Sequence, residues 1–144
     1  MVPSLIAIAG MLFNGWHSDK SRERRWHAAI PILAAGSLFL LVVGFRSQVL
    51  LAVVLLLLGT GVYYACQPVF WAIPTLILSE TAAASFGLIN TFGQLGGFVG
   101  PYIIGYLNDR THSLMASFWF IAAAYFISAS LILSLRKEDP RGAG

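Results

Sequence analysis

The chain has 144 residues, of which 58% are apolar, 13% aromatic and only 10% charged. Soluble domains carry about a quarter charged residues, so the nine Lys or Arg and six Asp or Glu of this chain cannot cover a globular surface. Composition therefore excludes a soluble enzyme and a disordered chain, and the single Cys66 excludes an internal disulfide framework. The net charge of +3 does not predict a nucleic-acid partner, because the basic residues lie between apolar segments. We predict an integral membrane protein.

Five segments without charged residues each predict a membrane-spanning α-helix, because about 20 residues at a rise of 1.5 Å cross the hydrocarbon core. The predicted spans are residues 1–15, 28–45, 49–71, 83–107 and 114–135. The fold class is therefore all-α, a polytopic transmembrane bundle. The first span is short, at about 22 Å, so we expect the chain to begin inside a helix of a longer protein.

The basic residues fall unevenly between the two sides of the membrane. Most of them follow the first or the fifth span: Lys20, Arg22, Arg24, Arg25, Arg136, Lys137 and Arg141. The opposite side holds Arg46 and Arg110. The positive-inside rule places the richer side in the cytoplasm. We therefore expect a cytoplasmic tail, residues 136–144, and a location in the plasma membrane (the cell inner membrane).

Polar and aromatic residues recur along one helical face of the third span. They are Thr60, Tyr64, Gln67 and Trp71, at positions i, i+4, i+7 and i+11. Pro68 and Pro74 interrupt the same span, and carbonyl groups freed inside a membrane are tolerated where they line a water-filled cavity. We predict that this span lines a cavity; the alternative is that Tyr64 and Trp71 fill an apolar core or an interface. The second and fifth spans offer few polar groups and are expected at the periphery.

The fourth span combines two amides with a row of glycines. Asn90 and Gln94 lie one turn apart, and amides in hydrocarbon need a partner, which is either another helix or a bound ligand. The glycines form two overlapping pairs with GxxxG spacing, Gly93 with Gly97 and Gly96 with Gly100. Small residues at this spacing let two helix backbones approach closely. We predict that the glycines serve helix packing, and the partner of the amides stays open.

The connection between the first and second spans reads GWHSDKSRERRWH, residues 15–27. Asp19 and Glu23 among four bases are compatible with a solvated ion-pair network. The order of residues also resembles the cytoplasmic signature of the major facilitator superfamily, in which a Gly precedes Ser-Asp-Lys/Arg and a pair of bases. The matching residues are Gly15, Ser18, Asp19, Lys20, Arg24 and Arg25. His17 stands where that family usually has an aliphatic residue, and Arg22 stands where a small one is common.

Residues 68–109 are similar to the corresponding stretch of anion:cation symporters of the tartrate and phthalate type. The shared features are a Phe-Trp-x-x-Pro break, an Ala-rich connection, Ile-Asn, and Gly-Gly-Phe-x-Gly-Pro. The resemblance covers essentially the whole chain, as the last five of twelve helices. It implies a transporter whose two six-helix halves rock around a site near the bilayer midplane.

The resemblance also implies roles for individual residues. Trp71 and Asn90 match positions that face the substrate. Gln67 and Tyr64 are our additions from the helical stripe, as neutral donors for the hydroxyl and carboxylate oxygens of an organic acid.

For the signature, the resemblance implies that Asp19 sits against a helix N-terminus of the other half, where the helix dipole favours a carboxylate. Reciprocally, the start of the fourth span near residues 79–81 would receive the matching acid of that half. The bases expected to bridge locally are Lys20, Arg24 and Arg25.

We expect the full-length protein to transport a small organic anion, a tartrate-like carboxylate, by proton-coupled symport. No reaction is catalysed, and no cofactor or metal is expected, because His17, His27 and His112 do not cluster in the sequence. No carboxylate or Arg lies inside a predicted span, so coupling groups are expected in the other half. The partners are the anion, protons and the lipid bilayer. The alternatives are transport of another solute (an aromatic acid, a sugar acid or a drug) and a truncated membrane protein that does not transport.

Overall fold

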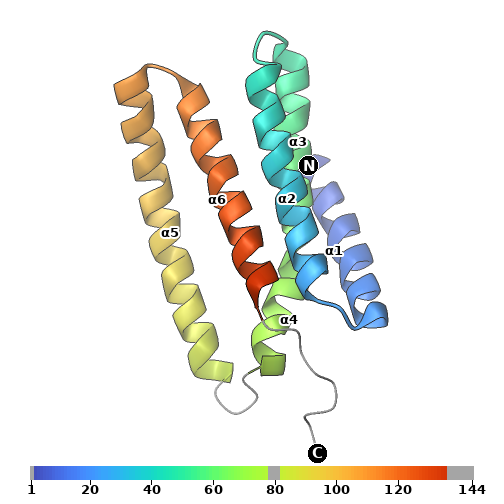
Figure 1. Ribbon diagram of the computed structural model, residues 1–144. Helices are drawn as coiled ribbons and strands as arrows, with labels where there is room; N and C mark the ends of the chain where they lie inside the picture. The colour runs from blue at the N-terminus through green and yellow to red at the C-terminus, as the bar shows by residue number, and fades with distance from the viewer. Residues whose placement is uncertain (1, 78–81, 136–144) are drawn as a thin grey trace, which may run out of the picture.

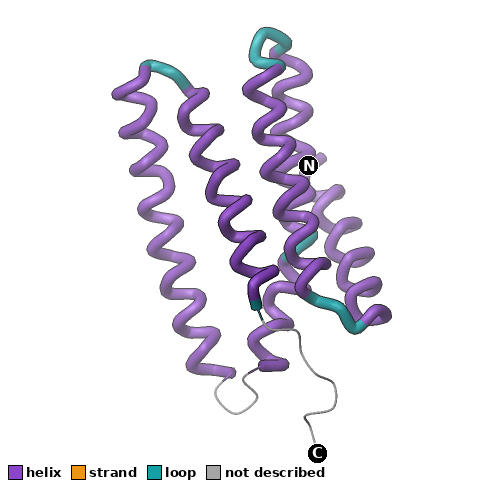
Figure 2. The backbone as a smooth tube through the Cα atoms, viewed as in Figure 1, coloured by secondary structure: helices purple, strands orange, loops and turns teal. Residues whose placement is uncertain are grey.

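Every element in the described part of the chain is an α-helix (Figure 2). The computed structural model describes residues 2–77 and 82–135. The helices are α1 (Val2–Ser21), α2 (Arg25–Gly44), α3 (Val49–Tyr64), α4 (Gln67–Ile77), α5 (Ala82–Thr111) and α6 (Leu114–Ser134). The predicted all-α class is confirmed.

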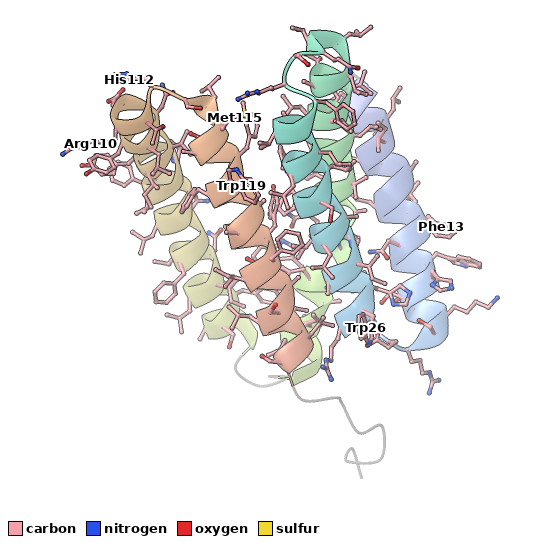
Figure 3. All side chains as sticks on the ribbon, turned by 45° about the horizontal axis from the view of Figure 1, so that its top comes forward. Phe13, Trp26, Arg110, His112, Met115 and Trp119 are labelled. Atoms are coloured by element: carbon pink, nitrogen blue, oxygen red, sulfur yellow. The ribbon has the colours of Figure 1, made fainter. Side chains whose placement is uncertain are left out.

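The helices run side by side and reverse direction at the turns between them (Figure 1). The turns at residues 45–48 and 112–113 lie at one end of the bundle, and the turn at residues 22–24 lies at the other. Figure 3 places Arg110 and His112 at the first of these ends and Trp26 near the second. The turn at residues 22–24 with its flanking bases, called the basic turn below, therefore shares an end of the bundle with the C-terminal end of α6.

The core of the bundle lies where α2 packs against α6 and α3. The buried face of α2 includes several small residues: Ala28, Ala29 and Ala35 are fully buried, and a Cβ built at Gly36 would lie 3.1 Å from the Tyr125 Cβ. Small side chains let helix backbones approach, which is how helices associate in lipid. Within the described bundle α2 is therefore central, whereas its apolar sequence had predicted a peripheral helix.

A second close approach joins α1 to α3. A Cβ built at Gly61 would lie 2.8 Å from the Ile6 Cβ, and one built at Gly10 would lie 2.9 Å from the Ala65 Cβ. These glycines serve helix packing, although sequence spacing had not singled them out. The predicted packing glycines of α5 differ, because no neighbour in the described chain lies within 4 Å of a Cβ at any of them: Gly93, Gly96, Gly97 and Gly100. Their packing role stays a prediction that needs a partner other than the described helices.

Within residues 2–77 and 82–135, three helical segments are long and apolar enough to cross a membrane: Arg25–Gly44, Val49–Thr75 and Leu114–Ser134. They correspond to the second, third and fifth predicted spans. The first and fourth predicted spans are also helical, as α1 and α5, and their crossing of the membrane stays a prediction. α1 continues past its predicted end at residue 15 as far as Ser21, so the expected long connection is a short turn at residues 22–24.

The third predicted span is broken between α3 and α4. Ala65 N–H donates to the Val62 carbonyl at 3.1 Å and Cys66 N–H to the Tyr63 carbonyl at 3.2 Å, which tightens the turn that ends α3. Pro68 then lacks the N–H that would continue the helical pattern to the Tyr64 carbonyl. The break therefore falls at residues 65–66, just before the proline.

Candidate functional site

A cavity of about 380 Å³ opens where α2, α4, α5 and α6 face one another. Sequence reasoning had proposed Gln67, Trp71 and Asn90 as solute contacts, and the structure brings these three residues to the same cavity. The remaining lining residues are Ile32, Tyr63, Cys66, Phe70, Ile89, Gly93, Gln94, Tyr125, Ser128 and Ile132. The volume falls in the range of small-molecule sites.

The α4 wall carries an oriented amide. Trp71 Nε1 donates a hydrogen bond of 3.0 Å to Gln67 Oε1, one helical turn away. The indole N–H is a donor only, so this bond fixes which end of the Gln67 amide is the oxygen. The Gln67 NH₂ group is thereby left to donate to a solute. The Trp71 ring is itself held by Phe70 at 5.6 Å and by Phe86 of α5 at 5.7 Å, measured between ring centroids.

The α5 wall supplies the two amides that sequence reasoning left without a partner. Asn90 and Gln94 lie one turn apart and both line the cavity. Gly93 lies between them in the same wall and has no side chain, so it leaves room for a solute. No other described helix provides a hydrogen-bond partner for these amides, so the choice between another helix and a ligand stays open.

The far walls contain residues that sequence reasoning had not assigned to a site. Tyr125 and Ser128 come from α6, the predicted peripheral span, and Tyr63 comes from the end of α3. The Tyr63 and Tyr125 rings stack with centroids 5.3 Å apart. The signal in the sequence was weak, because a Tyr and a Ser three residues apart in an apolar span are common.

Tyr64, the fourth proposed solute contact, lies in a different hollow. This hollow of about 430 Å³ lies between α1 and α3, and its lining includes Thr60 and Met11. Thr60 and Tyr64 therefore line one hollow and Gln67 and Trp71 another, and the solute contact of Tyr64 stays a prediction. The helical pattern on which that prediction relied does not run through the turn at residues 65–66, so the residues before and after it face different sides.

The cavity recognises solutes through neutral groups and rings. Its described lining holds no Asp, Glu, Lys or Arg. The Ser128 hydroxyl donates to the Ala124 carbonyl at 2.8 Å, so it can only accept from a solute. The donors left for a solute include the amides of Gln67, Asn90 and Gln94. Amide and hydroxyl groups donate to carboxylate and alcohol oxygens without a formal charge. The arrangement can bind a small polar solute by several directed hydrogen bonds against an aromatic floor.

The basic turn between α1 and α2 holds one of the expected ion pairs. Arg24 Nη2 lies 3.0 Å from Asp19 Oδ1, with side chains 25% and 68% exposed. Such an exposed pair contributes at most about 1 kcal/mol. Lys20 instead lies over the Trp16 ring, 5.2 Å from its centroid, and the Arg25 Nε is buried without a hydrogen-bond partner among the described residues. Local bridging is therefore found for Arg24 and not for the other two bases.

A second network shapes the same turn. The buried Ser18 hydroxyl donates to the Glu23 carbonyl at 3.1 Å, and the Glu23 carboxylate accepts from the Trp26 N–H at 2.9 Å, which caps α2. Arg22 has a φ of 51°, in the left-handed region. This backbone conformation is unfavourable for a residue that carries a Cβ. This conformation gives a physical reason why a small residue suits the position of Arg22.

Two histidines that the sequence separates meet beside this network. His17 Nδ1 lies 2.6 Å from His27 Nε2, and His27 Nδ1 lies 3.4 Å from Glu23 Oε2. The expectation that the histidines are dispersed is wrong for this pair. α1 continues through His17, and the turn at residues 22–24 then brings His27, in the first turn of α2, back beside it. The predicted docking of Asp19 on the other half stays a prediction, and residues 79–81, its expected counterpart, lie outside the described residues.

Together, these apolar helices define a helical membrane protein. The sequence model of the Major Facilitator Superfamily matches residues 1–101. The chain belongs to this superfamily. The signature resemblance of residues 15–27 is thereby confirmed at the level of the superfamily.

Curated relatives extend the similarity along the whole chain. A protein of Agrobacterium vitis named "Putative tartrate transporter" is 37% identical over 144 residues, which cover 99% of this chain and 33% of that protein. The Escherichia coli "Inner membrane transport protein RhmT" is 38% identical over 136 residues, 94% of this chain and 31% of that protein. The chain therefore spans about a third of the length of these relatives. No solved structure matches it.

Proposed function

We propose that the chain forms one wall of the solute path in a transporter of small organic anions, with a tartrate-like carboxylate as the solute. The observation that carries the proposal is the oriented Gln67 amide, which Trp71 holds by a 3.0 Å hydrogen bond in the cavity that Asn90 also lines. Similarity to the Agrobacterium vitis relative, whose name refers to tartrate, supports the solute class.

A hydroxydicarboxylate matches the donors of this wall. Its carboxylate and hydroxyl oxygens need several donors at once, and the amides of Gln67, Asn90 and Gln94 supply them. The Ser128 hydroxyl, which donates to the Ala124 carbonyl at 2.8 Å, can accept from a hydroxyl of the solute. A buried anion also needs a compensating positive charge. Because the described lining is uncharged, we place the compensating charge and the proton-coupling groups in parts of the protein beyond the described residues.

Transport then follows the alternating-access scheme of the superfamily, in which two halves rock around a site near the bilayer midplane. The break between α3 and α4 puts Gln67 at the first residue of α4, and irregular backbone in a membrane is tolerated where it lines a cavity. The basic turn around Arg24 is proposed to face the cytoplasm in the plasma membrane, together with residues 136–144, which lie outside the described residues.

An aromatic acid is the second candidate solute. The rings of Tyr63, Phe70, Trp71 and Tyr125 all line the cavity, and they would stack on a flat acid such as nicotinate. The two candidates differ in what they need from the site, because a flat acid relies on the rings and a polyhydroxy acid relies on the amides.

Uptake of radiolabelled tartrate by the full-length protein tests the proposal, with Asn90→Ala and Trp71→Ala measured in parallel. We expect KM for tartrate to rise in both variants while the amount of protein in the membrane stays the same. Competition separates the candidates, since unlabelled glucarate should inhibit if the solute is a hydroxy acid and nicotinate should inhibit if it is aromatic. Unchanged uptake in both variants would remove this cavity as the solute site.

A further inference from the structure

One side chain of α1 bonds to two other helices at once. Asn14 Nδ2 donates to the His27 carbonyl at 2.8 Å and to the Ala65 carbonyl at 2.8 Å. The amide is partly buried, and its partners lie 13 and 51 residues away in sequence. An amide NH₂ has two hydrogens, so both are used in joining α1 to the start of α2 and to the α3–α4 break.

Each of the two carbonyls lies at a place where helical hydrogen bonding is interrupted. His27 belongs to the first turn of α2, and the residue four positions later is Pro31, which has no N–H to return to the His27 carbonyl. Ala65 is one of the two residues between α3 and α4. Its carbonyl takes a hydrogen bond from Asn14, a side chain of another helix.

Inside a membrane such carbonyls find no water to accept a hydrogen bond from, so the protein itself must supply a donor. Asn14 provides it from a single side chain, and the Gly10–Ala65 contact brings α1 close enough for the bond to form. The position of the break thereby depends on α1. Cys66 and Gln67, which follow Ala65 directly, line the cavity.

We propose that Asn14 is a positioning residue of the solute site. It holds the 65–66 break in the geometry that presents Gln67 and Trp71 to the cavity, and it does so from the helix that carries the basic turn. The inference rests on the proposed function for its transport readout, and the side chain itself is not placed in contact with the solute.

The test uses the full-length protein with Asn14→Leu, which keeps the approximate volume and removes both donors. Asn108→Leu makes the same exchange near the end of α5, where the structure records no bond of that side chain, and serves as the matched control. We expect KM for radiolabelled tartrate to rise about fivefold in Asn14→Leu, the factor that corresponds to the one net hydrogen bond, to the Ala65 carbonyl, that holds the break. A role limited to folding would lower Vmax through the amount of protein and leave KM unchanged.

A second readout does not depend on any solute. Cys66 is buried beside the break, so its alkylation by N-ethylmaleimide, followed by mass spectrometry of the Cys66 peptide, reports how firmly the break is held. We expect alkylation to be about fivefold faster in Asn14→Leu and unchanged in Asn108→Leu. If the wild type takes up no tartrate, the proposed function fails and the Cys66 rate alone decides the role of Asn14.

Pro31→Ala provides a second-site check. It restores an N–H four residues after His27, which can donate to the His27 carbonyl. In this background Asn14→Leu should therefore raise KM and the rate of Cys66 alkylation by a smaller factor. If Asn14→Leu alone does not accumulate, recovery of the membrane-inserted protein in the double variant supports the proposal, and failure to recover overturns it. A KM and an alkylation rate within twofold of wild type in Asn14→Leu would also overturn it.

Discussion

Substitution of Trp71 by Phe isolates the hydrogen bond that orients the cavity amide. The change removes the Nε1–H that donates to Gln67 Oε1 at 3.0 Å. It retains an aromatic ring that can keep contact with Phe70 and Phe86, whose centroids lie 5.6 and 5.7 Å from that of Trp71. The amide of Gln67 is then free to rotate, and it no longer presents its NH₂ group to the solute at every encounter.

The expected change in KM follows from the free energy that one side-chain hydrogen bond contributes in a membrane protein. Such bonds contribute about 0.6 kcal/mol on average and about 1 to 2 kcal/mol in model helices. Because the Trp71–Gln67 bond is partly exposed to the cavity, we take about 0.6 to 1 kcal/mol, which corresponds to a three- to fivefold rise in KM. Vmax should change little, because the substitution leaves the backbone break in place.

Initial rates of tartrate uptake over a range of concentrations, with protein amounts from immunoblots, give KM and Vmax for the full-length variants. Trp119→Phe is the matched control, because Trp119 of α6 is 59% exposed and does not line the cavity (Figure 3). A double variant with Gln67→Leu completes the cycle. If Trp71 acts through Gln67, its substitution should have no further effect once the amide is gone.

Two outcomes would refute this reasoning. An equal rise of KM in Trp71→Phe and Trp119→Phe would show that the loss of an indole matters in itself and not its place in the cavity. Strictly additive effects of Trp71→Phe and Gln67→Leu would show that the two side chains act independently, and the 3.0 Å bond would then have no role in binding.

Two further predictions concern packing and topology. Gly61→Ala should lower the thermal midpoint of the detergent-solubilised protein, since its Cβ would lie 2.8 Å from a side chain of α1 and overpacking costs about 1 to 3 kcal/mol. Gly44→Ala should leave the midpoint unchanged, because a Cβ there has no neighbour within 4 Å in the described chain. Equal midpoints of the two variants would contradict the α1–α3 contact. A membrane-impermeant maleimide should label Ser47→Cys on intact cells and Ser21→Cys only after permeabilisation. Ser47 lies in the turn at residues 45–48 and Ser21 ends α1 beside the turn at residues 22–24, and these two turns lie at opposite ends of the bundle. The reverse labelling pattern would invert the proposed orientation.

Much of the fold could be predicted from the sequence, because it depends on local properties of the chain. The apolar runs predicted helices at 28–45 and 114–135, and the structure has Arg25–Gly44 and Leu114–Ser134. Pro68 predicted an interrupted third span for the same reason, since a missing N–H acts on its own helix. The signature around Asp19 indicated the superfamily from the order of residues alone.

The candidate site was predictable only in part. Gln67, Trp71 and Asn90 meet in one cavity as the sequence suggested, but Tyr64 does not, because periodicity assumes an unbroken helix and the turn at residues 65–66 ends that assumption. The contribution of Ser128 from a span predicted to be peripheral depends on how α6 packs, which no local pattern records.

The sequence by itself determined that the chain is a helical membrane protein of a known transporter superfamily, because burial in lipid and the covalent limits of proline act residue by residue. Only the tertiary structure decided which polar groups meet. The amide of Asn14 reaches carbonyls 13 and 51 residues away, and Gly61 rather than the α5 glycines makes the tight helix contact. Pairings of this kind depend on the distances between helices, and those distances are set by the packing of the whole bundle.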